Sequence, residues 1–358
     1  MIHSSKKIIL MTVLAAQFAA CKKDTDPVII VKPSNGAQIQ FNGLAGAEPG
    51  SAAGNLVFLD FSSNKTTTVA RASWDLGFYC GSDFRVILNN TTGAGAKVLA
   101  KNDLTTVTFA DTTGLTLAVN QFNPQPSELA YFDDIAGSIS ATAIPAVSAT
   151  AALNNVVIVN RGTAGSIAPR PWIKLRVLRN TSGGYTLQYA GITETTFRTL
   201  QVPKDGAWHF TFVSFDNGLV EVQPEKEKWD LVWSYSVFQT NFGAGLVPYN
   251  FSDLIAVNHL SGVQVKENIY ADAAIATAAY TAFNRDSVNN TTLATGRWTM
   301  GSNWRSASPT PGLSGVKKDR FYIIKDPAGN VYKLKCLSFH ADDGGTRGKP
   351  EFKYELIQ

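Results

Sequence analysis

The chain repeats itself once, and this duplication limits the folds open to it. Two Trp-Asp-Leu triplets, beginning at Trp74 and Trp229, lie about 155 residues apart. Other landmarks recur around them in the same order: a phenylalanine pair before each triplet, then a Gly-Ala-Gly, an aspartate-led run and a hairpin. The pairs are Phe58/Phe61 with Phe212/Phe215, Gly93–Gly95 with Gly243–Gly245, Asp103–Phe109 with Asp253–His259, and 172–189 with 321–339. A period of this length predicts two tandem domains, residues 43–203 and 204–358, rather than a solenoid of short repeats.

The segments between these landmarks indicate an all-β fold. They are short, rich in Val, Ile, Phe, Tyr and Thr, and separated by clusters of Gly, Asn, Thr and Ser. We expect a strand over 56–61 and two hairpins, 172–179 with 185–189 and 321–325 with 331–339. Only the alanine-rich stretch Asp272–Arg285 predicts a helix, with the aspartate as its cap. The expected fold is therefore two antiparallel β domains with at most one or two short helices.

The N-terminus has the pattern of a bacterial lipoprotein signal. Lys6 and Lys7 precede an apolar run over 8–20, and Cys21 follows two small alanines. The pattern predicts a signal peptide over 1–20, an acylated Cys21 and a tether over 21–42, so that the mature chain is anchored in membrane lipid. One alternative is an ordinary secreted protein with an incidental cysteine. A spanning helix is the other, but about 13 apolar residues are too few for a bilayer that needs about 20.

Charge and cysteine content limit the possible partners and covalent links. The net charge of +4 is mild, so we expect no nucleic-acid partner. Beyond Cys21 the chain has only Cys80 and Cys336, far apart and without a CxxC spacing, which argues against a zinc site or a redox dithiol. Two buried free thiols are favoured over one disulfide between them.

The second copy resembles a known family in the order of its short motifs. These motifs are Trp229–Trp233, Thr240–Gly243, the hairpin Tyr322–Lys335 and the terminal strand Phe352–Leu356. Together with the lipoprotein start they resemble the HmuY-like haem-binding lipoproteins of Bacteroidetes; the first copy carries the resemblance mainly at Trp74–Tyr79 and its hairpin. The resemblance implies a β fold around a ligand, haem capture at the cell surface and transfer to a TonB-dependent outer-membrane receptor. The charged start Lys22–Asp26 is similar to that of exported Bacteroidetes lipoproteins, which favours an outward-facing anchor in the outer membrane.

Haem iron needs axial ligands, and this chain departs from the family pattern at the position that supplies one. The resemblance places a histidine five residues after the triplet tryptophan, where this chain has Tyr79 in the first copy and Ser234 in the second. Tyrosine can bind ferric iron, whereas serine is a poor ligand. His259 is the favoured ligand because it follows the second Gly-Ala-Gly, in the region of the family's second histidine. Met300 is a further candidate as a soft ligand.

Other residues near these candidates suggest a planar ligand without naming it. Trp298 and Arg305 could line a haem site or hold a sugar, because indole rings offer stacking faces and guanidinium groups bind anions. His209 and His340 are expected to face solvent. The two triplets are expected to be structural, with the tryptophan buried and the aspartate bonded to turn amides.

Two functions from different classes follow from these observations. The first is a surface lipoprotein that binds haem or a related porphyrin and passes it to a receptor. The second is an adhesion, scaffold or glycan-binding lipoprotein that kept the fold and lost the axial ligands, which the residues at 79 and 234 favour. An enzyme is not expected, because the sequence has no nucleophile elbow, HExxH, P-loop or dinucleotide-binding motif.

Overall fold

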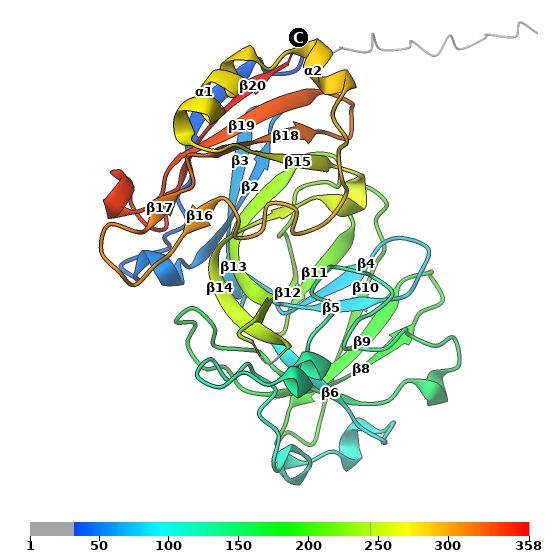
Figure 1. Cartoon of the computed structure of the whole chain (residues 1–358). Coiled ribbons are helices and arrows are strands. Elements are labelled where there is room, and N and C mark those ends of the chain that lie inside the picture. The colour runs from blue at the N-terminus through cyan, green and yellow to red at the C-terminus, as the bar shows by residue number, and fades with distance from the viewer. Residues whose placement is uncertain (1–31, 244, 358) are drawn as a thin grey trace, which may run out of the picture. The chain divides into compact units, whose positions relative to one another are not determined.

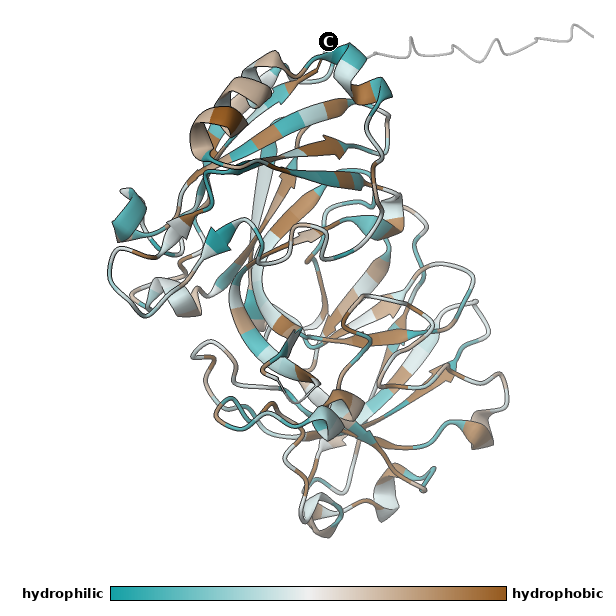
Figure 2. Ribbon diagram, in the orientation of Figure 1, coloured by the Kyte–Doolittle hydropathy of each residue, from teal (hydrophilic) through white to brown (hydrophobic). Residues whose placement is uncertain are grey.

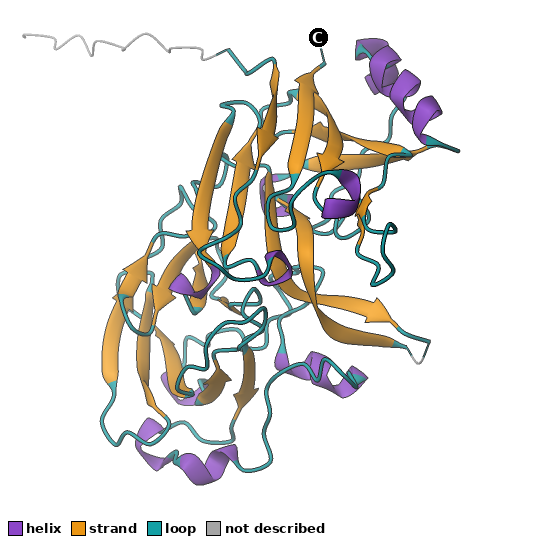
Figure 3. Cartoon of the chain, turned by 90° about the vertical axis from the view of Figure 1, so that its left-hand side faces the viewer, coloured by secondary structure: helices purple, strands orange, loops and turns teal. Residues whose placement is uncertain are grey.

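The computed structural model describes residues 32–243 and 245–357, and the predicted signal peptide and Cys21 lie outside them. From Pro33 onward the chain forms one compact unit. Antiparallel strands dominate it (Figures 1 and 3), as the sequence predicted. The α-helices are α1 (Ala273–Ala282) and α2 (Arg285–Asn289). Short 3-10 turns are η1 (Gly50–Ala52), η2 (Arg71–Ser73), η3 (Leu104–Thr106), η4 (Phe109–Thr112), η5 (Pro126–Tyr131), η6 (Ala151–Leu153), η7 (His259–Ser261) and η8 (Ala341–Asp343). Within the described ranges, no helix is long and apolar enough to cross a membrane.

Four antiparallel sheets carry the fold, and we number them I to IV. Sheet I has the order β1 (Gly36–Gln40), β20 (Glu351–Leu356), β19 (Val331–Ser338), β18 (Arg320–Lys325), β15 (Gln264–Ile269). Sheet II has the order β14 (Leu246–Val257), β13 (Leu231–Asn241), β2 (Asn55–Asp60), β3 (Lys65–Ala70). Sheet III has the order β12 (Gly218–Val220), β11 (Phe210–Ser214), β4 (Leu76–Tyr79), β5 (Val86–Leu88). Sheet IV has the order β10 (Arg198–Val202), β9 (Tyr185–Gly191), β8 (Ile173–Arg179), β7 (Val157–Asn160), β6 (Gly95–Val98). A small ribbon joins β16 (Arg305–Ser306) to β17 (Gly315–Val316).

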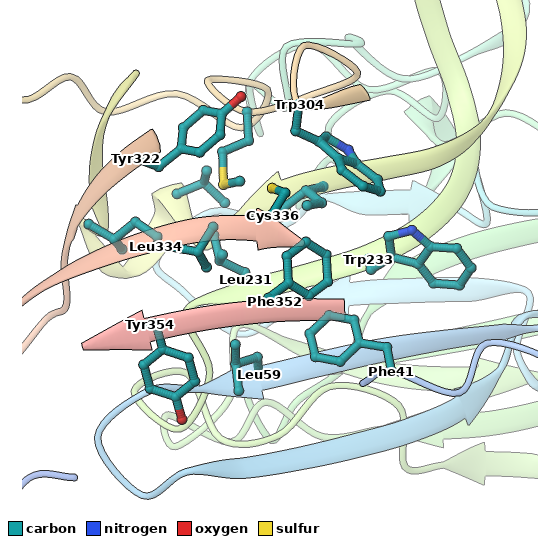
Figure 4. Close-up of a cluster of buried hydrophobic side chains, with 14 of the residues drawn as sticks. Phe41, Leu59, Leu231, Trp233, Trp304, Tyr322, Leu334, Cys336, Phe352 and Tyr354 are labelled. Carbon is teal, nitrogen blue, oxygen red and sulfur yellow. The ribbon is translucent and has the colours of Figure 1, made fainter. Parts of the chain in front are cut away.

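The four sheets pack face to face in the order I, II, III, IV, with an apolar core between each pair of neighbours. Sheets I and II enclose the first core, which Figure 4 shows around Trp233, Phe352 and Tyr354. Sheets III and IV enclose the second. The inner sheets II and III meet at the third core, made of Leu56, Phe58, Trp74, Phe210, Phe212, Val222 and Trp229. Hydrophobic residues accordingly occupy strands of all the layers (Figure 2). The central strands β2 and β4 of the inner sheets are buried along nearly their whole length, which explains why they read as nearly continuous apolar runs.

The two sequence copies exchange their first hairpins. The β2–β3 hairpin of the first copy pairs with β13, the triplet strand of the second copy, through Leu59 opposite Leu231. The equivalent β11–β12 hairpin of the second copy pairs with β4, the triplet strand of the first, through Val213 opposite Leu76. As a result, the compact halves of the fold do not coincide with the repeats. Sheets III and IV come entirely from residues 71–225, while sheets I and II combine residues 34–70 with residues 226–357.

The triplet aspartates tie the exchanged hairpins in place. The Asp230 carboxylate accepts the backbone N–H of Phe61 at 2.8 Å, and the Asp75 carboxylate accepts that of Phe215 at 2.9 Å. Both aspartates and both triplet tryptophans are buried. The prediction that these aspartates accept hydrogen bonds from turn amides is therefore confirmed. In each case, however, the amide belongs to the sequence copy that does not contain the aspartate.

Part of the predicted repeat alignment is wrong. Gly93 and Ala94 lie between β5 and β6, which begins at Gly95, whereas Gly243 and Gly245 lie between β13 and β14. Asp103–Phe109 forms 3-10 turns and loop, while the run from Asp253 continues β14. The structural equivalents are Asn89 and Asn258, which follow β5 and β14. Their side-chain amides donate to the triplet tryptophan carbonyls, Trp74 at 2.7 Å and Trp229 at 2.8 Å.

The remaining secondary-structure predictions agree with the structure. Both predicted hairpins are present as β8–β9 and β18–β19, and the Asp272 side chain caps α1 by accepting the N–H of Ile275. Residues 36–40, which the sequence placed in the tether, form β1 on the edge of sheet I. Cys80 and Cys336 are both free thiols; Cys336 is buried as expected, whereas Cys80 is partly exposed.

Candidate functional site

A cavity of about 110 Å³ lies in the third core, between sheets II and III. Because these sheets contain the exchanged hairpins, both copies build its walls. The apolar wall includes Leu56, Phe58, Trp74, Phe210, Phe212 and Trp229. The polar residues include Asn90, Asp133, His209, Ser234, His259 and Arg297. An apolar pocket with a few polar groups is the usual form of a small-molecule site.

The two triplet tryptophans occupy matching places in this wall. The Trp74 ring meets Phe212 edge to face, with centroids 4.9 Å apart, and the Trp229 ring meets Phe58 in the same way at 5.2 Å. Both indole Nε1 atoms are buried and have no hydrogen-bond partner among the described residues, and neither has the Asn90 Oδ1 atom. A buried polar group without a partner costs about 1–3 kcal/mol. The triplets, which the sequence assigned a structural role, therefore also form the candidate site.

Charged groups gather where the segment 133–142 covers the cavity. Asp133 is buried, and desolvation raises its pKa to about 6 although its oxygens accept the N–H groups of Leu88 and Ala143 at 2.7 and 2.9 Å. Arg297 lines the same region, and desolvation lowers its pKa. Gly137 has a φ of +85°, and a Cβ there would come within 2.8 Å of Arg297 Cδ and 2.9 Å of His259 Cε1. Segment 133–142 is thus in close contact with both side chains.

The favoured ligand, His259, lines the cavity, but its ring nitrogens face backbone carbonyls. Nε2 lies 3.1 Å from the oxygen of Gly137, and Nδ1 lies 3.4 Å from that of Val257. Desolvation lowers its pKa, so the neutral ring is favoured. His209, which was expected to face solvent, instead lines the cavity and its Nε2 bonds Ser261 Oγ at 2.7 Å. Burial lowers the pKa of His209 to about 4.

The other predicted site residues divide between this cavity and distant places. Trp298 lines the cavity and donates from Nε1 to the Ile135 carbonyl at 2.5 Å. Met300 is fully buried in the core between sheets I and II. Arg305 is buried and donates to the Ser252 and Asp253 carbonyls. Tyr79 packs near Phe210 at the end of β4 and does not line the cavity. Met300, Arg305 and Tyr79 therefore do not join His259 in one site.

Ser234, the position at which the family pattern has a histidine, does line the cavity. Its hydroxyl donates to the Tyr235 carbonyl at 2.5 Å. The cavity thus lies where the resemblance implies a ligand, but without that histidine.

This arrangement does not fit haem. The cavity is smaller than the roughly 300–1,000 Å³ that drug-sized ligands occupy. Haem iron also needs a free axial donor, usually from His, Met, Cys or Tyr. The only such residues described in the cavity wall are His209 and His259, and the Nε2 atoms of both are engaged in hydrogen bonds.

Sequence reasoning missed the residues that loops deliver to the site. Asp133 lies in the long β6–β7 connection and Arg297 in the segment between α2 and β16, so no strand period places them. The only available signal was the neighbourhood of Arg297, which precedes Trp298 in a region already marked by its indoles.

A comparison with known families gives one match. The model described as HmuY protein matches residues 52–209 and again residues 208–354. No curated protein and no solved structure matched the chain. The two matches correspond to the two sequence copies, and together they cover most of the chain.

Proposed function

Because the chain belongs to the HmuY family, which consists of non-enzymatic haem-binding lipoproteins, we propose that it is a lipid-tethered capture protein at the cell surface. Its ligand site is the cavity between sheets II and III. One observation supports this choice above others: the two copies build the cavity jointly around Ser234, the place of a family histidine. The captured ligand then passes to a TonB-dependent receptor, near which the anchor at Cys21 keeps the protein.

The ligand that this site favours is not haem. Binding haem iron through His259 would require breaking its contact with the Gly137 carbonyl and moving segment 133–142. Of the two functions that the sequence suggested, the geometry favours the loss of axial ligands that the second assumes, while the capture of a small ligand is kept from the first. Family membership favours the other function, haem capture, so a direct test between them is needed.

A haemin titration separates these two functions. We expect the chain from residue 21 onward, carrying Cys21→Ser, to give no Soret shift with haemin, because the Nε2 atoms of both cavity histidines lie in hydrogen-bond contacts. His259→Ala should behave like the parent protein. His340→Ala is the matched control, since His340 bonds within its own loop, to Asp342. A Soret shift that His259→Ala abolishes and His340→Ala retains would establish haem capture instead.

The tether makes a separate prediction about location. Replacing Cys21 by Ser in the full-length chain should move the protein from the membrane fraction to the soluble fraction, because a serine hydroxyl cannot take the place of the acylated thiol. Cell fractionation with immunoblotting measures this, and protease treatment of whole cells measures surface exposure. Cys80→Ser serves as the control. Retention of the Cys21→Ser protein in the membrane fraction would contradict the lipid anchor.

A further inference from the structure

We infer that the cavity binds a small carboxylate with a flat apolar body, the carboxylate at Arg297 and the body between Trp74 and Trp229. The inference rests on the proposed function, since it names the class of ligand that the capture site takes. Three features of the cavity carry it: a cation that forms no hydrogen bond or ion pair with the described residues, two aromatic walls, and a volume suited to a single ring.

Arg297 provides the cation. Its guanidinium lies 5.0 Å from the Trp298 ring, but it makes no hydrogen bond or ion pair with any residue that the structure describes. Arg297 is half-buried in this wall, so a ligand that displaced water from its guanidinium would have to supply a counter-charge in return. A carboxylate is the natural partner, since its two oxygens accept two parallel N–H groups of the guanidinium fork. The open place beside Arg297 is therefore best filled by a ligand carboxylate.

The acidic residues near Arg297 do not fill that place. Each oxygen of Asp133 already accepts a backbone N–H, from Leu88 or from Ala143, and an Asp134 oxygen accepts the N–H of Ser138 at 2.9 Å. These bonds hold the Asp133 carboxylate against β5 and the Asp134 carboxylate within its own segment, and neither carboxylate forms an ion pair with Arg297 in the described structure. Their negative charge weakens the attraction of the cavity for anions, and burial of Asp133, which raises its pKa to about 6, reduces that effect only as the pH falls to about 6 and below.

The body of the ligand follows from the walls and the volume. An engineered apolar cavity of about 150 Å³ takes up benzene, so about 110 Å³ suits one small ring rather than a fused macrocycle. The rings of Trp74 and Phe212 and those of Trp229 and Phe58 form the apolar surface, where flat molecules pack favourably.

Benzoate and toluene are the probes that test this inference on the Cys21→Ser chain from residue 21 onward. Tryptophan fluorescence and the melting temperature report binding, because three tryptophans line the cavity. We expect benzoate to change both signals, and Arg297→Gln to weaken benzoate at least about tenfold while leaving toluene unchanged, since a charge-assisted pair is worth about 1.5–3 kcal/mol. Arg285→Gln, on the exposed face of α2, is the matched control and should bind both probes normally.

Several outcomes would overturn the inference. Toluene binding without benzoate binding, or equal benzoate affinity in Arg297→Gln, would refute the carboxylate. If Arg297→Gln fails to fold, Ile87→Phe is the second variant; it fills the cavity wall and should weaken both probes, and unchanged binding would refute the site. If the protein binds neither probe and no haemin, the inference of a small aromatic carboxylate is refuted. The proposal of a non-haem ligand stands in that case, because only a Soret shift with haemin would refute it.

Discussion

A chain of residues 71–225 is expected to fold on its own, whereas residues 43–203, the first sequence copy, are not. The 71–225 segment contains every strand of sheets III and IV and every buried residue of the core between them. The 43–203 segment lacks β11 and β12, and its β2–β3 hairpin loses β13. It therefore loses Phe210, Phe212 and Phe215. Truncating a buried phenylalanine costs about 3–5 kcal/mol, so the loss of all three is comparable with the roughly 5–15 kcal/mol that stabilises a whole domain.

Far-UV circular dichroism and urea unfolding measure the difference between the two fragments. We expect a cooperative transition for 71–225, at a lower stability than in the full chain because sheet III loses its cover from Leu56, Phe58 and Trp229. We expect none for monomeric 43–203. Mixing 43–203 with 204–358 is the control, since together they restore both exchanged hairpins. A folded 43–203 monomer as stable as 71–225 would show that the copies close independently.

The two triplet aspartates are expected to respond to the same substitution in opposite ways. The buried Asp75 carboxylate is paired with Arg161 at 2.8 Å and with Arg170 at 3.1 Å. Asp75→Asn should therefore destabilise the fold by at most about 3–5 kcal/mol, because the buried Arg161 keeps only the exposed Asp216 as a counter-charge and Arg170 loses its partner. Asp230 has no cationic partner among the described residues, and desolvation raises its pKa to about 8. Asp230→Asn removes this buried acid and keeps an acceptor for the N–H of Phe61.

The pH dependence of stability provides the measurement for Asp230. A carboxyl whose folded pKa is raised above its unfolded value of about 3.9 disfavours the folded state increasingly as pH rises from about 4 to about 8. Four units correspond to roughly 5 kcal/mol as an upper limit. Urea unfolding at pH 5, 7 and 9 should therefore show Asp230→Asn gaining stability over the parent as pH rises. A constant difference between the two proteins across this range would contradict the raised pKa.

Much of the fold could be predicted from the sequence, because local patterns determine it. The hairpin turns at 180–184 and 326–330, the cap at Asp272 and the duplicated triplets all carry their signals within a few residues. The hairpin exchange has no such signal. The apolar residues of β2 and β11 recur at nearly the same spacing, so either hairpin has the pattern to pair with either triplet strand.

The candidate site was less accessible to sequence reasoning for two reasons. Its walls depend on the exchange, which brings Trp74 and Trp229 to one cavity, and its charged residues come from loops. The repeat alignment also failed after the triplets, because β13 and β14 are long strands where the first copy has the short β4 and β5. Because of this difference, two structurally unrelated Gly-Ala-Gly sequences lie at similar distances after the two triplets. The sequence therefore suggested that they are equivalent positions of the two copies, which they are not in the structure.

The hairpin exchange also determines how a ligand can enter. Each copy holds a strand pair of the other, so the copies cannot swing apart like two jaws without breaking the β2–β13 and β4–β11 ladders. The cavity is therefore rigid on its sheet sides. Segment 133–142 covers it from a loop, and among the described residues its hydrogen bond to His259 is a single one, in which the Gly137 carbonyl accepts from the His259 ring. The rates of ligand binding and release should therefore follow the rate at which this loop opens. Changes in the loop would alter both rates while the sheets joined by the exchanged hairpins stay in place.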